Sequence, residues 1–415
     1  MTADSQNGGG AVWTRRLVAL AVTGVVIGIL VRIAILPSEG FRGDLNQFVE
    51  WVHGLATHPF GLAYDQSIGF PPVMVYIWGL MAAIQPGFQT ATDSSDVGIR
   101  VLMKLPATIA DFGLAAAVGY ALRERPRLAL SAAIAILLHP AVIDVSAWWG
   151  QYESIYVLAA VVAFLFAVAD RPGPAAVALA IALMTKPQAL PFLVPFAAWF
   201  LARYGLAATI RLGAIGAATI GILWLPFLPA GGPLAYARNL AQYQGEVFSV
   251  LSLQAWNPWW LVQEAFGQNQ FISDAVPIAG PVTLRLFGYV VTALLELVVF
   301  AWVWRSPTPR SLALGLMAAT LVAFIGLTSM HERYAYPAIV FVLLALPHRQ
   351  VALLWFVVSL LVAFNILAAS APTPEIARVL PDFGTTSVVG SIALTLVTFS
   401  VLGYLRSQGQ SGMAT

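Results

Sequence analysis

Long apolar runs, separated by short polar turns, are the main pattern along this chain. Residues are apolar throughout each run, whereas a half-buried strand would alternate with a period of two. Most runs approach the roughly 20 residues that a helix needs to cross a bilayer. In hydrocarbon every backbone polar group must be bonded within the protein, which leaves helices or a closed barrel. The pattern therefore predicts an all-α fold, that of a polytopic membrane protein.

About twelve transmembrane helices are expected. We place them at residues 17–36, 100–122, 128–142, 154–170, 174–186, 188–203, 207–228, 285–304, 310–328, 334–347, 350–369 and 386–406. Arg and Lys in short loops mark the cytoplasmic side. With these spans that side receives Arg15, Arg16, Arg123, Arg125, Arg127, Arg171, Arg203, Arg211, Arg305, Arg310, Arg349 and Arg406. The tails 1–16 and 407–415 are then cytoplasmic, and 17–406 is a single transmembrane domain. The first run lacks a small-residue cleavage site, so we interpret it as a retained helix.

Residues 71–84 are apolar but short, and their assignment decides the topology. Counting them as a crossing would place Arg123, Arg125 and Arg127 outside and invert every later loop. We therefore interpret them as a surface or re-entrant helix. Two large extracytoplasmic loops result: an acidic one at 37–99, and one at 229–283 rich in Trp, Tyr, Asn, Gln and Pro.

Composition supports a membrane protein and removes several functions. The 415 residues are 59% hydrophobic and only 10% charged, whereas soluble domains are about a quarter charged. The net charge of +2 comes with no basic cluster between aromatics, so no nucleic-acid partner is expected. Cysteine is absent, which excludes disulfides and thiolate metal sites. No nucleotide-binding or metal-ligand motif occurs, so no cofactor is predicted.

The chain has two lysines, Lys104 and Lys186, both at predicted outer helix ends, and Arg32 lies near the end of the first helix. A single cation there can simply extend to the lipid headgroups. Several on one face would instead form an anion site, such as one for a lipid phosphate.

Asp44 follows the first helix. It can cap a short helix or remain solvated, or it can act as a general base towards an acceptor hydroxyl.

The segment HPAVIDVSAWWGQYES (139–154) brings Asp144, Trp149, Gln151 and Glu153 to an outer helix end. An interfacial aromatic belt would explain the tryptophans, whereas the added polar groups favour a sugar or headgroup site. Asp111, about halfway along its helix, is expected to be paired or hydrogen-bonded.

The turn SMHERYAYP (329–337) holds His331 and Arg333, which are suitable phosphate ligands. A salt-bridged cap between helices is the alternative. Trp256 and Asn257, in FSVLSLQAWNPWW (248–260), belong either to a membrane-surface belt or to an acceptor platform.

Six of these segments, in this order, resemble the GT-C superfamily of integral membrane glycosyltransferases, and most of all its dolichyl-phosphate-glucose-dependent glucosyltransferases and their bacterial relatives. Besides Asp44, the resemblance lies in GFPPVMVY (69–76), KLPATIADF (104–112), HPAVIDVSAWWGQYES, TKPQALPFLVP (185–195) and MHERYAYP (330–337). This sequence departs from the family pattern at three places. It has Lys104 where Arg is usual, WWGQYES in place of HFQYN, and HERY in place of HEK.

The resemblance implies an inverting, metal-independent hexosyltransferase of the cell membrane, with its active site on the extracytoplasmic face. Asp44 would be the base, and Lys104, Lys186, His331 and Arg333 would hold the phosphate of a polyprenyl-phosphate sugar, glucose or mannose. Asp144, Trp149, Gln151, Glu153, Trp256 and Asn257 would contact the sugar or the acceptor, which is a lipid-linked, polysaccharide or protein hydroxyl. A lipid or solute transporter, a polysaccharide polymerase or ligase, and a non-catalytic subunit remain alternatives.

Overall fold

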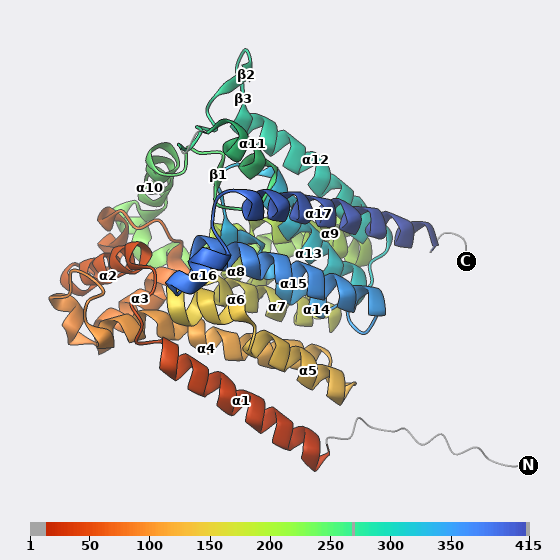
Figure 1. Cartoon of the computed structure of the whole chain (residues 1–415), viewed down its shortest axis with the longest axis horizontal. Coiled ribbons are helices and arrows are strands. Elements are labelled where there is room, and N and C mark those ends of the chain that lie inside the picture. Colours follow the sequence, from red (N-terminus) through yellow and green to blue (C-terminus); the bar gives the residue numbers. More distant parts are fainter. Residues whose placement is uncertain (1–13, 268–269, 412–415) are drawn as a thin grey trace, which may run out of the picture.

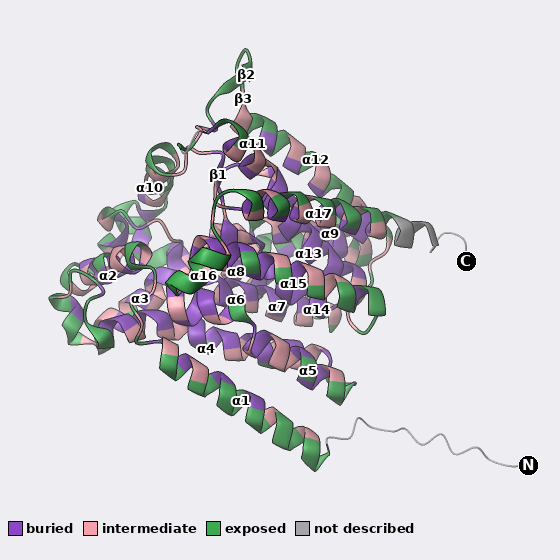
Figure 2. Ribbon diagram, viewed as in Figure 1, coloured by how far each residue is buried: buried purple, intermediate pink, exposed green. Residues whose placement is uncertain are grey.

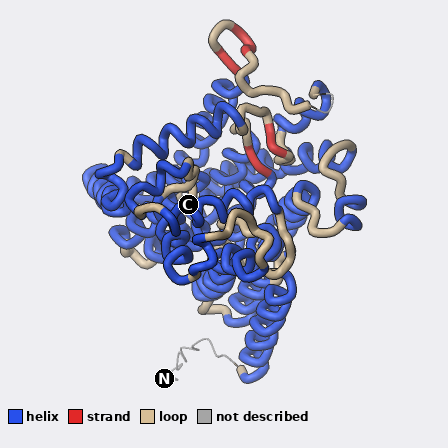
Figure 3. Tube along the Cα trace, turned by 90° about the vertical axis from the view of Figure 1, so that its left-hand side faces the viewer, coloured by secondary structure: helices blue, strands red, loops and turns tan. Residues whose placement is uncertain are grey.

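The computed structural model describes residues 14–267 and 270–411, with side chains described as far as residue 406. Residues 1–13 and 412–415 of the predicted tails lie outside this range. Within the described part, helices form nearly the whole fold, and the strands are confined to one region (Figure 3).

The elements are as follows. The α-helices are α1 (Arg15–Ile35), α2 (Arg42–Thr57), α3 (Pro72–Ile84), α4 (Val97–Ala121), α5 (Pro126–Leu137), α6 (Pro140–Ile143), α7 (Glu153–Val168), α8 (Pro172–Thr185), α9 (Leu193–Trp224), α10 (Gly232–Glu246), α11 (Pro258–Phe266), α12 (Leu284–Arg305), α13 (Pro309–Gly326), α14 (Tyr336–Leu343), α15 (Arg349–Ala369), α16 (Pro374–Val379) and α17 (Thr385–Ser411). The 3₁₀ helices are η1 (Phe60–Gln66), η2 (Pro86–Gln89), η4 (Pro187–Phe192), η5 (Leu225–Ala230) and η6 (Glu332–Ala335), and η3 (Asp144–Trp149) is a π-helix. The strands are β1 (Ser252–Leu253), β2 (Pro277–Ala279), β3 (Val282–Thr283) and β4 (Met330–His331).

Each predicted span contains a helix, but not every helix is long enough to cross a membrane. In the described residues seven helical segments are long and apolar enough, or eight if the bent pair 126–137 and 140–149 forms one span. The segment 187–230 is one of these seven and is interrupted at Gly205, between the predicted helices 188–203 and 207–228. The helices α7, α8 and α14 have 16, 14 and 8 residues, fewer than the roughly 20 that a straight crossing needs. The twelve crossings therefore remain a prediction.

α1 packs along α5 through one narrow face. Its buried residues are Gly24, Gly28 and Arg32, which recur every four positions. A Cβ on Gly28 would come within 2.8 Å of the Leu137 side chain. Small residues at this spacing let two membrane helices approach closely, and the rest of α1 is largely exposed (Figure 2).

α13 is the central helix of the bundle. Every residue from Ser311 to Gly326 is buried, and α9, α12, α14 and α17 pack around it. Both the start of α1 and the end of α17 lie at the end of the molecule opposite α2 and α3 (Figure 1). The cytoplasmic placement of both termini stays a prediction.

The predicted loop 37–99 folds into a compact cap with a core of its own. α2, α3, η1 and η2 surround Phe48, Trp51 and Trp78, which are buried. α3 packs against α2 and α8. The expected large first loop with short helices is therefore present.

The fold is helical as predicted, apart from two short two-stranded sheets. β2 and β3 form an antiparallel hairpin, and β1 pairs in parallel with β4. The second pair joins the 229–283 segment to the turn that contains His331.

Candidate active site

Asp44 lies in the first turn of α2, where a negative charge is favoured by the helix dipole. Phe41, not Asp44, is the N-cap residue. The Asp44 Oδ2 atom accepts hydrogen bonds from Trp149 Nε1, at 2.9 Å, and from Gln151 Nε2. No described residue donates to Oδ1, and the side chain is 30% exposed. Asp44 is therefore held by one oxygen and open at the other.

The connection between α1 and α2 fixes where α2 begins, and therefore where Asp44 lies. Lys104 Nζ donates to the Ser38 carbonyl at 2.7 Å, and also to Leu36 O and Ser38 Oγ. Arg100 donates to the Pro37 carbonyl at 2.9 Å. The Lys104 ammonium is thus occupied by this connection and is not part of the charged cluster described below. In the structure Lys104 positions this connection, and its predicted phosphate contact stays a prediction.

The π-helix η3 turns Trp149 and Gln151 towards Asp44. Such single-turn π segments occur frequently at functional sites. Gly150 ends it with a φ of +88°, and a Cβ there would lie 2.6 Å from Leu45 Cδ2. Glycine is favoured here because it adopts this positive φ without strain and leaves room for the Leu45 side chain.

Lys186 and Glu153 form a buried ion pair beside Gln151. Lys186 follows α8 and Glu153 begins α7, and their side chains are 4% and 0% exposed. Lys186 Nζ also donates to Gln151 Oε1 at 3.2 Å. Gln151 therefore links the lysine directly to Asp44. The other Glu153 oxygen, Oε2, has no hydrogen-bond partner among the described residues.

Arg333, in η6, lies among three carboxylates. Its guanidinium is 2.7 Å from Glu332 Oε1, 3.4 Å from Glu153 Oε1 and 3.9 Å from Asp44 Oδ2. It also lies over the Trp149 ring, 4.6 Å from the ring centre. The Nε group has an ion-pair contact with Glu153 but no aligned hydrogen bond within the described part of the chain. The expected basic patch is thus interleaved with acids.

His331 is neutral in this setting. Burial and the Arg333 charge lower its pKa from the ordinary 6.5. Arg333 Nη1 lies 3.2 Å from Nδ1, and since arginine can only donate, the imidazole proton belongs on Nε2. Burial by itself would raise the pKa of Glu332, but the charge of Arg333 outweighs it and keeps that pKa below its ordinary value. His331 therefore offers an N–H group rather than the expected positive charge.

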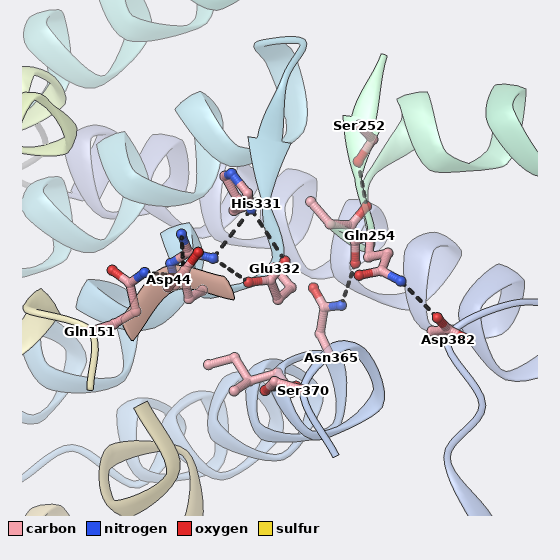
Figure 4. Close-up of polar contacts among 12 residues, drawn as sticks. Asp44, Gln151, Ser252, Gln254, His331, Glu332, Asn365, Ser370 and Asp382 are labelled. Carbon is pink, nitrogen blue, oxygen red and sulfur yellow. Dashed lines mark hydrogen bonds and ion pairs between the residues drawn. The ribbon is translucent and has the colours of Figure 1, made fainter. Parts of the chain in front are cut away.

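The β1–β4 pairing fixes the backbone of His331. Gln254 continues β1 and bridges to His331, with its side chain donating to Asp382 Oδ2 at 2.7 Å. Asn365 Nδ2 donates to the Gln254 carbonyl at 2.7 Å. Figure 4 shows these supports on one side of Glu332, and Asp44 with Gln151 on the other.

Three predicted contact residues lie outside this cluster. Asp144 faces α15, where Ser370 donates to it at 3.1 Å. Trp256 is buried, and its backbone N–H donates to Asn365. Asn257 caps α11 and donates to the Phe324 carbonyl at 3.0 Å. Trp256 and Asn257 are fully engaged inside the bundle, so the acceptor platform predicted there is not formed.

Asp111 is paired, as expected for a carboxylate within a membrane helix. Arg32 donates to its Oδ2 atom through Nε and Nη2, at 3.1 and 2.7 Å. Ser146 and Ser154 donate to the same carboxylate, and Ser154 also contacts Tyr336 at 2.9 Å.

Glu332 is not among the site residues predicted from the sequence, although it is the closest partner of Arg333. Its position directly before that arginine, in a turn with few other charges, was the available signal. Six predicted residues do come together: Asp44, Trp149, Gln151, Glu153, Lys186 and Arg333, with His331 at their edge.

The sequence matches no protein-family model and no curated protein.

Proposed function

We propose that this protein transfers a hexose from a polyprenyl-phosphate sugar to an acceptor hydroxyl, with Asp44 as the general base. The observation that carries the proposal is the state of Asp44. Trp149 and Gln151 hold one oxygen, and the other oxygen is open in a cluster whose remaining charged side chains are buried. A proton acceptor in this role must be both oriented and accessible.

The donor phosphate would bind next to Asp44. Arg333 Nε has no hydrogen-bond partner in the described cluster, and Nη2 of the same guanidinium lies 3.9 Å from Asp44 Oδ2. His331, in contact with that guanidinium, would offer its Nε2–H group as well. A guanidinium matches the geometry of a phosphate. Lys186 would contribute positive charge without touching the phosphate directly, because its ammonium group is already bonded to Glu153 and Gln151.

The reaction would be one displacement at the anomeric carbon. The acceptor oxygen forms the new glycosidic bond while its proton passes to Asp44. The bond between the anomeric carbon and the phosphate oxygen breaks, and its electron pair leaves with the phosphate. Cations fixed beside the leaving group lower the barrier most when its charge develops. Attack opposite the leaving group inverts the configuration.

The test is sugar transfer by the purified full chain in nanodiscs, using labelled polyprenyl-phosphate hexoses and a membrane lipid extract. Asp44→Asn should lower kcat/KM by about 10²–10⁴-fold, the usual contribution of a general base, while donor binding persists. Glu50→Gln is the matched control, because Glu50 is an exposed carboxylate on the same helix. Turnover by Asp44→Asn within about twofold of wild type would remove Asp44 from the mechanism.

Transport of a lipid or solute is the second candidate, favoured by one observation. Glu296 is an ionisable residue within α12, and intramembrane carboxylates often mark transport paths. Counterflow of labelled polyprenyl-phosphate hexose in proteoliposomes separates the two functions. Transport that survives Asp44→Asn, without any glycosylated product, would favour the transporter.

A further inference from the structure

An apolar groove lies behind Tyr334, on the bundle side of the charged cluster. It has a volume of about 440 Å³ and runs between α12, α13 and the segment that follows Lys186. Leu190, Val194, Ala323 and Leu327 are among its walls. Such a lining suits hydrocarbon.

Two polar side chains of α12 also line this groove. Thr292 and Glu296 are one turn apart, and each is 8% exposed. The Thr292 hydroxyl and both Glu296 carboxyl oxygens have no hydrogen-bond partner in residues 14–267 and 270–411. Glu296 is twelve residues into α12, which places it about 18 Å along the helix axis. A carboxyl group without a partner at this depth is costly.

The neighbouring Asp111 shows what a structural carboxylate looks like in the same bundle. Arg32, Ser146 and Ser154 satisfy it completely. Glu296 has none of this support, although it too is buried, at 8% exposed against 0% for Asp111. Its partner must therefore enter through the groove, and it must be able to form a hydrogen bond with a carboxyl group, which accepts in either protonation state and also donates when it is protonated.

The dimensions of the groove limit what that partner can be. The groove has a volume of about 440 Å³ and a mainly apolar lining, which suits a single hydrocarbon chain. A lipid chain fits. A polyprenyl chain or a saturated acyl chain carries no hydrogen-bonding group and would leave Glu296 unpaired.

We propose that the groove binds a lipid whose chain carries a hydroxyl or an amide, a group that both donates and accepts hydrogen bonds and pairs with Glu296 and Thr292. This lipid differs from the polyprenyl-phosphate donor, and its site stands whether or not the chain transfers sugar. Glu296 supplies the acceptor oxygen, and the Thr292 hydroxyl bonds the oxygen of the incoming group.

The test compares two labelled probes that differ by one hydroxyl, 12-hydroxyoctadecanoic acid and octadecanoic acid, on the full chain in nanodiscs. Wild type should prefer the hydroxylated probe by about 3–10-fold, the contribution of one net hydrogen bond. Glu296→Leu should remove the preference and bind octadecanoic acid at least as well. Glu296→Gln keeps an acceptor oxygen and should retain the preference, which provides a readout if the leucine variant does not fold.

Equal binding of the two probes by wild type would overturn the proposal. A preference that survives Glu296→Leu would overturn it as well. Co-purification of a second membrane protein that blocks both probes would replace it with a subunit interface. Because binding is measured without sugar transfer, these outcomes are independent of the Asp44 test.

Discussion

Replacing Arg32 by methionine tests how α1 is held to the bundle. Arg32 and Asp111 are 2% and 0% exposed. The guanidinium also donates to the Leu137 carbonyl at 2.9 Å, so it joins α1 to both α4 and the end of α5. Nearer the start of α1, an apolar groove of about 400 Å³ is lined by α1, α4 and α5. The ion pair is therefore the strongest polar attachment of this helix.

The expected loss follows from the bonds that disappear. Arg32→Met removes two of the four hydrogen bonds that the Asp111 carboxylate receives. A hydrogen bond to a charged group contributes about 1.5–3 kcal/mol, so two amount to about 3–6 kcal/mol. Breaking a buried ion pair from one side costs about 3–5 kcal/mol in other proteins, which agrees.

The assay is unfolding by SDS titration in mixed micelles, followed by tryptophan fluorescence. Arg32→Met with Asp111→Leu should recover most of the loss, because no unpaired charge is left buried. Arg42→Met is the control, since it breaks the exposed pair of Arg42 with Glu39 and should leave the unfolding midpoint unchanged. An Arg32→Met midpoint equal to that of the control, or a double variant no more stable than the single one, would refute the reasoning.

Two further predictions concern the charged cluster. Trp149→Phe keeps an aromatic ring beneath Arg333 but loses the N–H group that donates to Asp44. The kcat for sugar transfer should therefore fall by about tenfold, with the donor KM unchanged. A kcat within about twofold of wild type would show that Gln151 alone orients Asp44. Burial and Arg333 lower the pKa of His331 in the folded protein. At a pH below the ordinary histidine pKa, the unfolded chain therefore binds more protons than the folded protein does. Wild type should lose stability as pH falls from about 7 to about 5. His331→Gln should lose less over that range in the same SDS titration, and equal losses would contradict the assignment of a neutral imidazole.

The helices and the main members of the cluster could be predicted because each has a local signature. Apolar runs and loop arginines define the spans, and a polar residue at the end of such a run stands out. Asp44, Glu153, Lys186 and Arg333 were found in this way, from four separate segments. Their assembly on one side of the molecule then followed from the topology.

The contacts of each side chain could not be predicted, since they depend on backbone far away in sequence. Lys104 was expected to face a phosphate, yet the carbonyl groups of Leu36 and Ser38 take its protons. Trp256 was expected at a surface, but α15 and α17 cover it, with Gly390 directly against its ring. Two-residue strands such as β1 and β4 are too short to leave a pattern.

The acidic and basic side chains around Arg333 determine whether binding of the donor phosphate also takes up a proton. Three carboxylates and two cations share this space, so an arriving phosphate adds negative charge to a site that is already negative. Uptake of a proton is the least costly compensation, and the imidazole of His331 is in contact with the guanidinium that the phosphate would engage. Donor affinity should therefore be coupled to the acidity of the medium, through a group that carries no charge at rest.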